Sequence, residues 1–143
     1  MLKNIDPLIS PQLLKILMEM GHGYEIVIAD GNFPAASIAQ RLVRADGHGV
    51  CPLIESILKL FPLDIYVPNP VSLMAVVQGD DTKPTIWEKY RQIIKSSGEN
   101  FTDFEFVERF AFYDRAKSAY AVLATGETAL YANIILKKGV VTD

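Results

Sequence analysis

The sequence predicts a three-layer α/β/α fold with a mixed, largely parallel central sheet, in a single domain that spans residues 1–143. Short β-branched runs alternate with stretches in which apolar residues recur at helical spacing, an order typical of a sheet covered by helices on both faces. The length of 143 residues corresponds to one domain of about 150 residues. Half of the residues are hydrophobic and 22% are charged, as in globular proteins.

The first helix and the first strand have clear boundary residues. Ser10 can cap a helix N-terminus and Pro11 is tolerated at the first helical position, so the apolar residues that follow predict a helix over residues 11–20. The β-branched run of residues 25–29 predicts a buried strand, which ends at Asp30. An acidic residue directly after a buried strand is expected at the rim of the sheet.

The remaining elements follow in alternation. We expect a short helical turn over residues 34–40 and an exposed strand over residues 41–44. A helix that begins at Pro52 carries apolar residues along one side and ends at Pro62. The second half of the chain predicts, in order, a strand at 71–77, a helix from Pro84 to Ser96, a strand at 104–107, a helix at 108–117, a strand at 119–124 and a final strand at 134–136.

Charge and hydropathy argue against two classes of partner. The chain has 14 Lys and Arg and 17 Asp and Glu, a net charge of −3, and the two signs are interleaved, whereas nucleic-acid binding normally needs a clustered positive surface. No run of 18 apolar residues occurs, and the first residues lack the apolar stretch of a signal peptide. We therefore expect a cytoplasmic protein that binds neither nucleic acid nor a membrane.

Few residues are available for cofactor, metal or thiol chemistry. Neither common glycine-rich nucleotide-binding motif occurs, and two histidines and one cysteine supply no zinc-like spacing. Cys51 is expected at the start of a helix, where its thiol pKa could be lowered, so a thiol-dependent hydrolase is one hypothesis. A buried, unreactive cysteine is more common. His48 is most simply a loop residue.

His22 and Asp30 are the first candidates for a functional site. His22 stands between Gly21 and Gly23, where no bulky neighbour hinders a ligand, and an imidazole exchanges protons near neutral pH. Asp30 follows a strand at the edge where open α/β sheets bind ligands, and its carboxylate can accept two hydroxyl hydrogen bonds or orient His22. The alternatives are an exposed histidine at a helix end and an ordinary Asp-Gly turn.

Three further side chains extend the candidate site. Arg109 stands near the start of a predicted helix, where a surface ion pair is its more common role. Tyr131 and Asn133 are separated by one residue, so in an extended chain both side chains project from the same face. A phenol and an amide side by side can hydrogen-bond a polyhydroxylated ligand, and capping of a strand edge is an equally good interpretation.

Several longer stretches resemble the L-fucose mutarotase branch of the ribose pyranase and fucose mutarotase family. They occur in the family's order along nearly the whole chain, and the section from Asp64 to Phe104 matches least clearly. The stretches are Ser10-Pro11-Gln12-Leu13-Leu14, Glu19-Met20-Gly21-His22-Gly23, Ala29-Asp30-Gly31-Asn32-Phe33-Pro34, Arg44-Ala45-Asp46-Gly47, Arg109-Phe110-Ala111-Phe112-Tyr113-Asp114-Arg115-Ala116, and Thr125-Gly126-Glu127 through Tyr131-Ala132-Asn133 to Val140.

This resemblance implies an isomerase that interconverts the α and β anomers of a sugar, L-fucose, without a metal or cofactor. Arg109 stands where the ribose-specific relatives carry a histidine, which favours L-fucose over D-ribose. The resemblance also implies a homo-oligomeric ring, a decamer of stacked pentamers, with sites near subunit contacts. By position, His22 is similar to the family's proton donor, Asp30 and Arg109 to its sugar-binding residues, and Tyr131, Ala132 and Asn133 to its C-terminal substrate contact.

These candidate side chains suit the proton transfers that opening of a sugar ring requires. Ring opening gives a proton to the ring oxygen while the anomeric hydroxyl loses one, so we expect His22 to act at the ring oxygen and Asp30 to hold sugar hydroxyls and the orientation of His22. Arg109 stays charged and binds oxygen, and Phe33 or Tyr113 offers a stacking face. A D-ribose pyranase and a non-catalytic monosaccharide-binding accessory protein of sugar uptake remain the alternatives.

Overall fold

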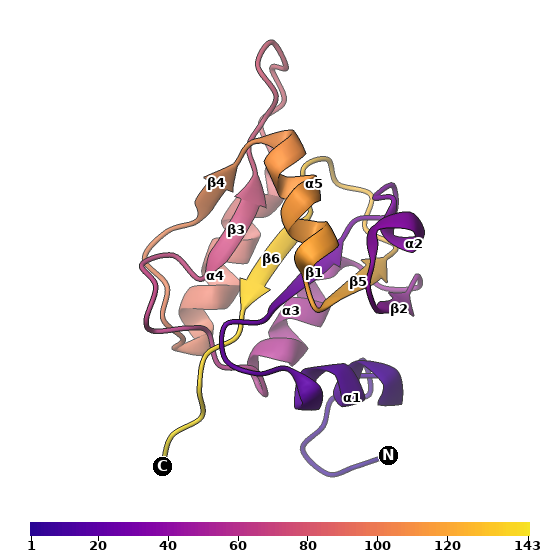
Figure 1. Cartoon of the computed structure of the whole chain (residues 1–143), viewed down its shortest axis with the longest axis vertical. Coiled ribbons are helices and arrows are strands. Elements are labelled where there is room, and N and C mark those ends of the chain that lie inside the picture. Colours follow the sequence, from indigo (N-terminus) through magenta and orange to yellow (C-terminus); the bar gives the residue numbers. More distant parts are fainter.

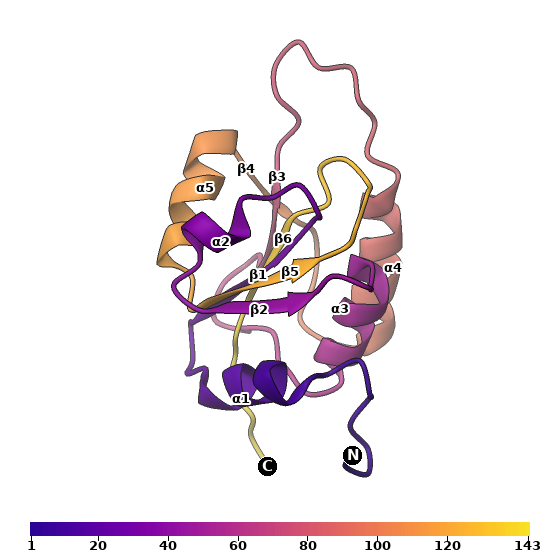
Figure 2. The same cartoon turned by 90° about the vertical axis from the view of Figure 1, so that its right-hand side faces the viewer.

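In the computed structural model, which describes residues 1–143, helices cover both faces of one six-stranded sheet (Figures 1 and 2). The strands are β1 (Glu25–Ala29), β2 (Leu42–Ala45), β3 (Val71–Met74), β4 (Glu105–Val107), β5 (Ala121–Thr125) and β6 (Ile134–Lys137). The helices are α1 (Pro11–Glu19), α2 (Ala35–Ile38), α3 (Val50–Leu58), α4 (Ile86–Ser97) and α5 (Arg109–Ser118).

The strands stand in the order β2-β5-β1-β6-β3-β4. All adjacent pairs are parallel except those that β6 forms with β1 and β3, to which it is antiparallel. The predicted three-layer fold with a mixed, largely parallel sheet is therefore confirmed. The direction of β6 brings the residue that precedes it to the edge at which the parallel strands end.

Each face of the sheet packs against its own helices. On one face, α1, α3 and α4 bury the larger hydrophobic cluster, which holds 26 residues. On the other, α2 and α5 cover a cluster of 12 residues. Strand β1 contributes to both, with Ile26 and Ile28 in the first cluster and Val27 and Ala29 in the second. Its uninterrupted apolar sequence follows from this burial on two faces.

Helix α3 and strand β3 each have one boundary that differs clearly from the predicted one. Helix α3 begins at Val50 instead of Pro52, since the carboxylate of Glu127 accepts a hydrogen bond from the Val50 N–H at 3.1 Å and caps the first turn. Strand β3 ends at Met74 instead of residue 77. The chain leaves the sheet there, and the segment that joins β3 to α4 projects from the upper end of the molecule (Figure 1).

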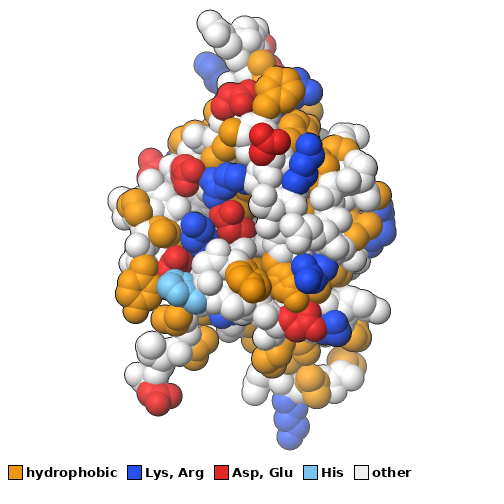
Figure 3. Space-filling model, in the orientation of Figure 1, with side chains coloured by type: hydrophobic (Ala, Val, Ile, Leu, Met, Phe, Trp, Pro, Cys, Tyr) orange, Lys and Arg blue, Asp and Glu red, His pale blue; other side chains and the backbone are white.

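The surface mixes all classes of side chain. On the face drawn in Figure 3, acidic and basic groups lie between separate groups of apolar ones. None of the helices is both long enough and apolar enough to span a lipid bilayer.

Candidate functional site

An open pocket with a volume of about 290 Å³ lies at the carboxyl edge of the parallel strands. Asp30 follows β1 and Arg109 follows β4, while Asn133 precedes the antiparallel β6 and so reaches the same edge. Open α/β sheets bind ligands at this edge. Six residues predicted from the sequence line the pocket, namely Asp30, Phe33, Arg109, Tyr113, Tyr131 and Asn133.

Asp30 is half-buried and lines the pocket. Its backbone N–H donates to Oδ1 of Asn133 at 2.7 Å, and its own Oδ1 accepts from the Asn32 N–H at 2.9 Å. Burial, helped by the charge of Glu127, raises the pKa of Asp30 above its ordinary value, while hydrogen bonds from the backbones of Asn32 and Phe33 and from the Asn133 side chain oppose this rise. Because Asn133 uses its amide oxygen here, its NH₂ group is the part that can donate to a ligand.

Tyr131 differs from its predicted geometry. Its φ of 56° is left-handed, so the chain is not extended at this residue. The hydroxyl donates to Oδ2 of Asp80 at 2.5 Å and accepts from the Val77 N–H at 3.3 Å, while the Tyr131 carbonyl accepts from Nε1 of Trp87. The bond to Asp80 raises the pKa of Tyr131. The phenol therefore stays protonated and is held against the projecting segment.

Arg109 begins α5 and is exposed at the rim of the pocket. None of the ion pairs in the structure involves it, in contrast to the expected surface pair. Its guanidinium lies over the ring of Phe110, 5.4 Å from the ring centre. Phe33 and Tyr113 stack with their ring centres 5.5 Å apart and an interplanar angle of 16°. The pocket thus has a free cation at its rim and an aromatic wall.

Ala132 does not line the pocket. Its side chain is fully buried in the core, and its carbonyl accepts a hydrogen bond from the hydroxyl of Tyr90 at 2.7 Å. The buried Ala132 therefore fixes the backbone between the two pocket residues Tyr131 and Asn133.

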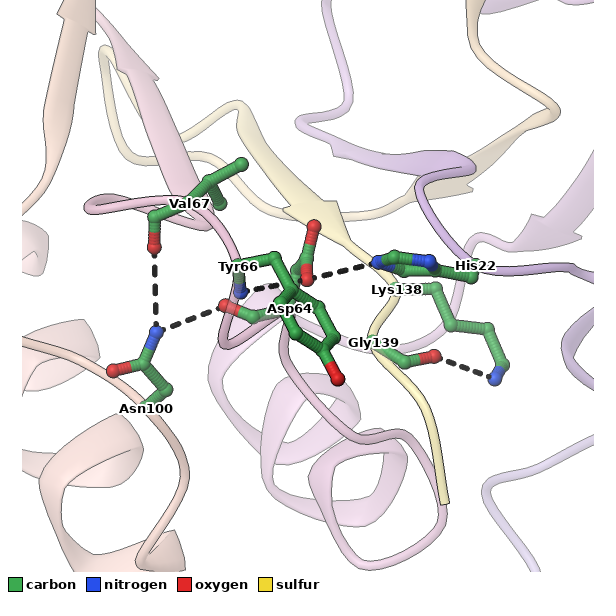
Figure 4. Close-up of polar contacts among 7 residues, drawn as sticks. All are labelled: His22, Asp64, Tyr66, Val67, Asn100, Lys138 and Gly139. Carbon is green, nitrogen blue, oxygen red and sulfur yellow. Dashed lines mark hydrogen bonds and ion pairs between the residues drawn. The ribbon is translucent and has the colours of Figure 1, made fainter. Parts of the chain in front are cut away.

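His22 lies at the opposite edge of the sheet, before β1, whereas Asp30 follows it. A strand of five residues extends about 17 Å. Within one chain the imidazole is therefore remote from the pocket, so Asp30 does not orient the His22 of its own chain. Nε2 of His22 instead lies 3.0 Å from Oδ1 of Asp64 (Figure 4). The His22 side chain is 46% exposed and its carboxylate partner only 4%.

Comparison with known proteins identifies the family to which the chain belongs. A model of the RbsD / FucU transport protein family matches residues 3–141. The chain belongs to this family. The L-fucose mutarotase of Actinobacillus pleuropneumoniae is 55% identical over 140 residues, which cover 98% of this chain and 97% of that protein. The resemblance to the L-fucose mutarotase branch is therefore confirmed.

Solved structures of RbsD / FucU proteins agree with the fold. The fucose mutarotase from Streptococcus pneumoniae, crystallised in complex with L-fucose, is 56% identical, with a TM-score of 0.92 over 99% of this chain and 100% of that chain. Bacillus subtilis RbsD complexed with D-ribose is 22% identical, with a TM-score of 0.68 over 93% of this chain and 95% of that chain. The second likeness is one of fold.

Two carboxylates that contact the candidate residues of this RbsD / FucU chain were not expected from the sequence. Asp64 and Asp80 both lie in the section from Asp64 to Phe104, in which no candidate residue was predicted, and Asp80 belongs to a stretch that resembles an ordinary polar turn. Asp64 stands between Leu63 and Ile65, and an acidic residue in such an apolar context is a signal for a buried, paired charge. That signal does not identify the partner.

Cys51 lacks the properties of a nucleophile in this RbsD / FucU chain. It is half-buried in the first turn of α3, and burial together with the charge of Glu127 raises its thiol pKa. The lowered thiol pKa on which the hydrolase hypothesis depended is therefore contradicted. His48 is an exposed residue of the loop before α3 and lies in a turn, as expected.

Proposed function

We propose that this chain is an isomerase that interconverts the α and β anomers of L-fucose by acid-base-catalysed opening and closure of the sugar ring. The observation that carries this proposal is the convergence of a carboxylate, a free guanidinium, an amide and an aromatic wall on one open pocket, in a chain more than half identical to fucose mutarotases. These are the groups that bind a neutral polyhydroxylated ligand.

Each pocket residue has a role that suits its chemistry. Asp30 accepts hydrogen bonds from two sugar hydroxyls, while the NH₂ group of Asn133 and the guanidinium of Arg109 donate to sugar oxygens. Phe33 and Tyr113 present a flat apolar surface to the C–H face of the ring. During opening the bond from C1 to the ring oxygen breaks, C1 becomes an aldehyde, the ring oxygen gains a proton and the anomeric hydroxyl loses one.

We propose that His22 meets the pocket of a neighbouring copy, since its own pocket lies at the other edge of the sheet. Exposed apolar side chains border both places. Ile65 and Tyr66 are 63% and 67% exposed in the segment that follows Asp64, and Leu130 is 62% exposed at the pocket rim. Burial of such surfaces favours association. We therefore propose a homo-oligomer in which the sites form between copies. The decameric ring and the cytoplasmic location stay predictions.

Magnetisation-exchange NMR on the anomeric protons tests the activity directly. We expect the protein to accelerate α to β exchange of L-fucose, more than that of D-ribose or D-galactose. His22→Gln should abolish the acceleration and His48→Gln should leave it unchanged. Line broadening without faster exchange would instead indicate a sugar-binding accessory protein, and a preference for D-ribose would indicate a ribose pyranase.

Mixing of two inactive variants tests whether the site is shared. His22→Gln keeps the pocket and lacks the imidazole, whereas Arg109→Ala keeps the imidazole and has a damaged pocket. When the two are unfolded and refolded together in equal amounts, about one quarter of the intersubunit sites combine both intact parts, and activity should return accordingly. Activity that stays at the level of the separate variants would contradict a shared site.

A further inference from the structure

We propose that Asp64 is a positioning residue that holds Nε2 of His22 as a hydrogen-bond donor and thereby makes Nδ1 the nitrogen that exchanges the proton with the sugar. This inference rests on the proposed function and deepens it, because it assigns the reacting atom. It starts from the hydrogen bond between Nε2 of His22 and Oδ1 of Asp64 at 3.0 Å, drawn in Figure 4.

The backbone places the two side chains beside each other. Past the end of β6, the carbonyl of Lys138 accepts from the Gly23 N–H and its N–H donates to the Tyr24 carbonyl, both at 2.8 Å. On its other side Lys138 forms an antiparallel bridge with Leu63, and the Asp64 N–H donates to the Lys137 carbonyl at 3.1 Å. The segments that carry His22 and Asp64 are thus fixed on either side of one extended strand.

Asp64 is itself held in place. It is 3% exposed, its Oδ1 also accepts from the Tyr66 N–H at 3.0 Å, and its carbonyl accepts from Nδ2 of Asn100 at 2.9 Å (Figure 4). A buried carboxylate with fixed partners constrains the imidazole to one orientation. The ring of Tyr66, whose centre lies 5.3 Å from that of His22, covers the imidazole from one side.

The charge of Asp64 determines which ring nitrogen carries hydrogen. Burial opposes ionisation, but the hydrogen bonds from Tyr66 and His22, with the charges of His22 and Lys137, lower the pKa of Asp64 below its ordinary value. An ionised carboxylate only accepts hydrogen bonds, so Nε2 must be the N–H nitrogen in both the neutral and the protonated ring. Tyr66, Lys137 and Lys138 are the other titratable groups beside this pair.

Nδ1 is then the nitrogen that changes its protonation. It has no hydrogen-bond partner in its own chain, and the side chain is 46% exposed, which leaves this nitrogen for a ligand. The protonated ring gives its Nδ1 proton to the ring oxygen as the bond from C1 breaks, while the anomeric hydroxyl gives its proton to water. Closure runs in reverse and returns the proton to Nδ1, and the carboxylate of Asp64 stabilises the imidazolium that is present before opening and after closure.

The tautomer of His22 can be measured on a chain that keeps both His22 and Asp64. Long-range ¹H–¹⁵N NMR spectra of the His48→Gln protein contain the signals of His22 alone. We expect neutral His22 to carry its hydrogen on Nε2, with Nδ1 at the chemical shift of an unprotonated ring nitrogen. A hydrogen on Nδ1 would overturn the proposal, whether or not any Asp64 variant folds.

Kinetics of Asp64→Asn give a second, independent test. We expect kcat for L-fucose to fall on the order of 10- to 100-fold with KM within about 2-fold, as for lost partners of functional histidines. A fall in kcat without a matching change in KM separates lost positioning of the imidazole from lost binding of the sugar. A kcat equal to that of the wild type would contradict the proposal.

Two variants serve as references for this test. Asp64→Glu keeps the carboxylate and should recover part of the lost kcat together with the Nε2–H tautomer. Asp114→Asn removes an exposed carboxylate on α5 that forms no ion pair, and should match the wild type. If the wild-type chain does not accelerate anomer exchange, the proposed function fails, whereas the tautomer measurement still reports on Asp64.

Discussion

Asp30 and Asp64 have opposite electrostatic environments. Burial dominates at Asp30 and raises its pKa, while at Asp64 hydrogen bonds and neighbouring positive charge overcome burial and lower the pKa. Asp64 therefore contributes stability that is present above the ordinary carboxyl pKa and is lost as the pH falls through its lowered value. Asp30 has the opposite sign, so its ionisation costs stability. A group that opposes folding in this way is typical of a binding site.

The raised pKa of Asp30 predicts a pH dependence of substrate binding. When Asp30 is protonated it accepts fewer hydroxyl hydrogen bonds, so KM for L-fucose should increase as the pH falls through its pKa. This increase should begin at a higher pH than for an ordinary carboxyl group. KM measured across the acidic range checks this, and Asp30→Asn should have a raised KM without the pH dependence. A wild-type KM that stays constant to below pH 4, roughly the ordinary carboxyl pKa, would contradict it.

Tyr131→Phe should loosen the pocket wall. The substitution removes the hydroxyl that donates to Asp80 and accepts from the Val77 N–H, and so releases the projecting segment between β3 and α4 from the pocket. We expect KM for L-fucose to rise roughly 3- to 10-fold, the effect of one or two lost hydrogen bonds. Amide hydrogen exchange in that segment should become faster. Unchanged exchange there would show that the phenol does not hold the segment.

The ends of the elements, more than their interiors, supply the functional groups. Strand β1 has His22 before it and Asp30 after it, and Arg109 is the first residue of α5. The orientation of Arg109 therefore depends on how α5 begins. Glu108 caps this helix, since its side chain accepts hydrogen bonds from the N–H groups of Phe110 and Ala111 at 2.9 and 3.1 Å.

Glu108→Ala should affect stability and binding together. Loss of the cap should lower the free energy of unfolding by about 0.5 to 2 kcal/mol, as measured in urea. Fraying of the first turn displaces Arg109, so KM for L-fucose should rise as well. Glu108→Gln keeps one acceptor oxygen and should show a smaller change in both quantities. A destabilised Glu108→Ala protein with an unaltered KM would show that the cap does not position Arg109 for binding.

The whole molecule places its two candidate functional centres at opposite edges of one sheet. In Figure 2, α1 lies at the lower end of the molecule and the segment between β3 and α4 at the upper end. His22 follows α1, and the pocket lies at the base of that projecting segment. A single copy cannot bring the imidazole to a sugar bound in its own pocket, which is why assembly belongs to the proposed function.

Dilution should therefore reduce activity per subunit. As copies dissociate by mass action, the fraction of complete sites falls, and specific activity should fall with it. Anomer exchange rates measured over a range of protein concentrations, beside sedimentation analysis of the same samples, check this dependence. Saturating L-fucose should restore part of the activity, because ligand bound between copies favours assembly. A dissociated monomer with full activity would contradict it.

Much of the fold could be predicted because its signals are local. The β-branched run of β1 and the apolar periodicity of α4 depend on neighbours a few residues away, and a strand buried on both faces has to be apolar throughout. The start of α3 could not be predicted in this way, because its cap comes from Glu127, 77 residues further along the chain. The same holds for the left-handed backbone of Tyr131.

The sequence by itself determined the three-layer fold, the family and the residues that gather at the pocket. Asp30, Arg109, Tyr131 and Asn133 could be named in advance because each follows or precedes a recognisable element, and elements of known direction end at known edges. Only the tertiary structure decided that His22 stands apart from them and that Asp64 is its partner. That pairing joins residues 42 positions apart through the strand extension at Lys138, and no local pattern encodes such a contact.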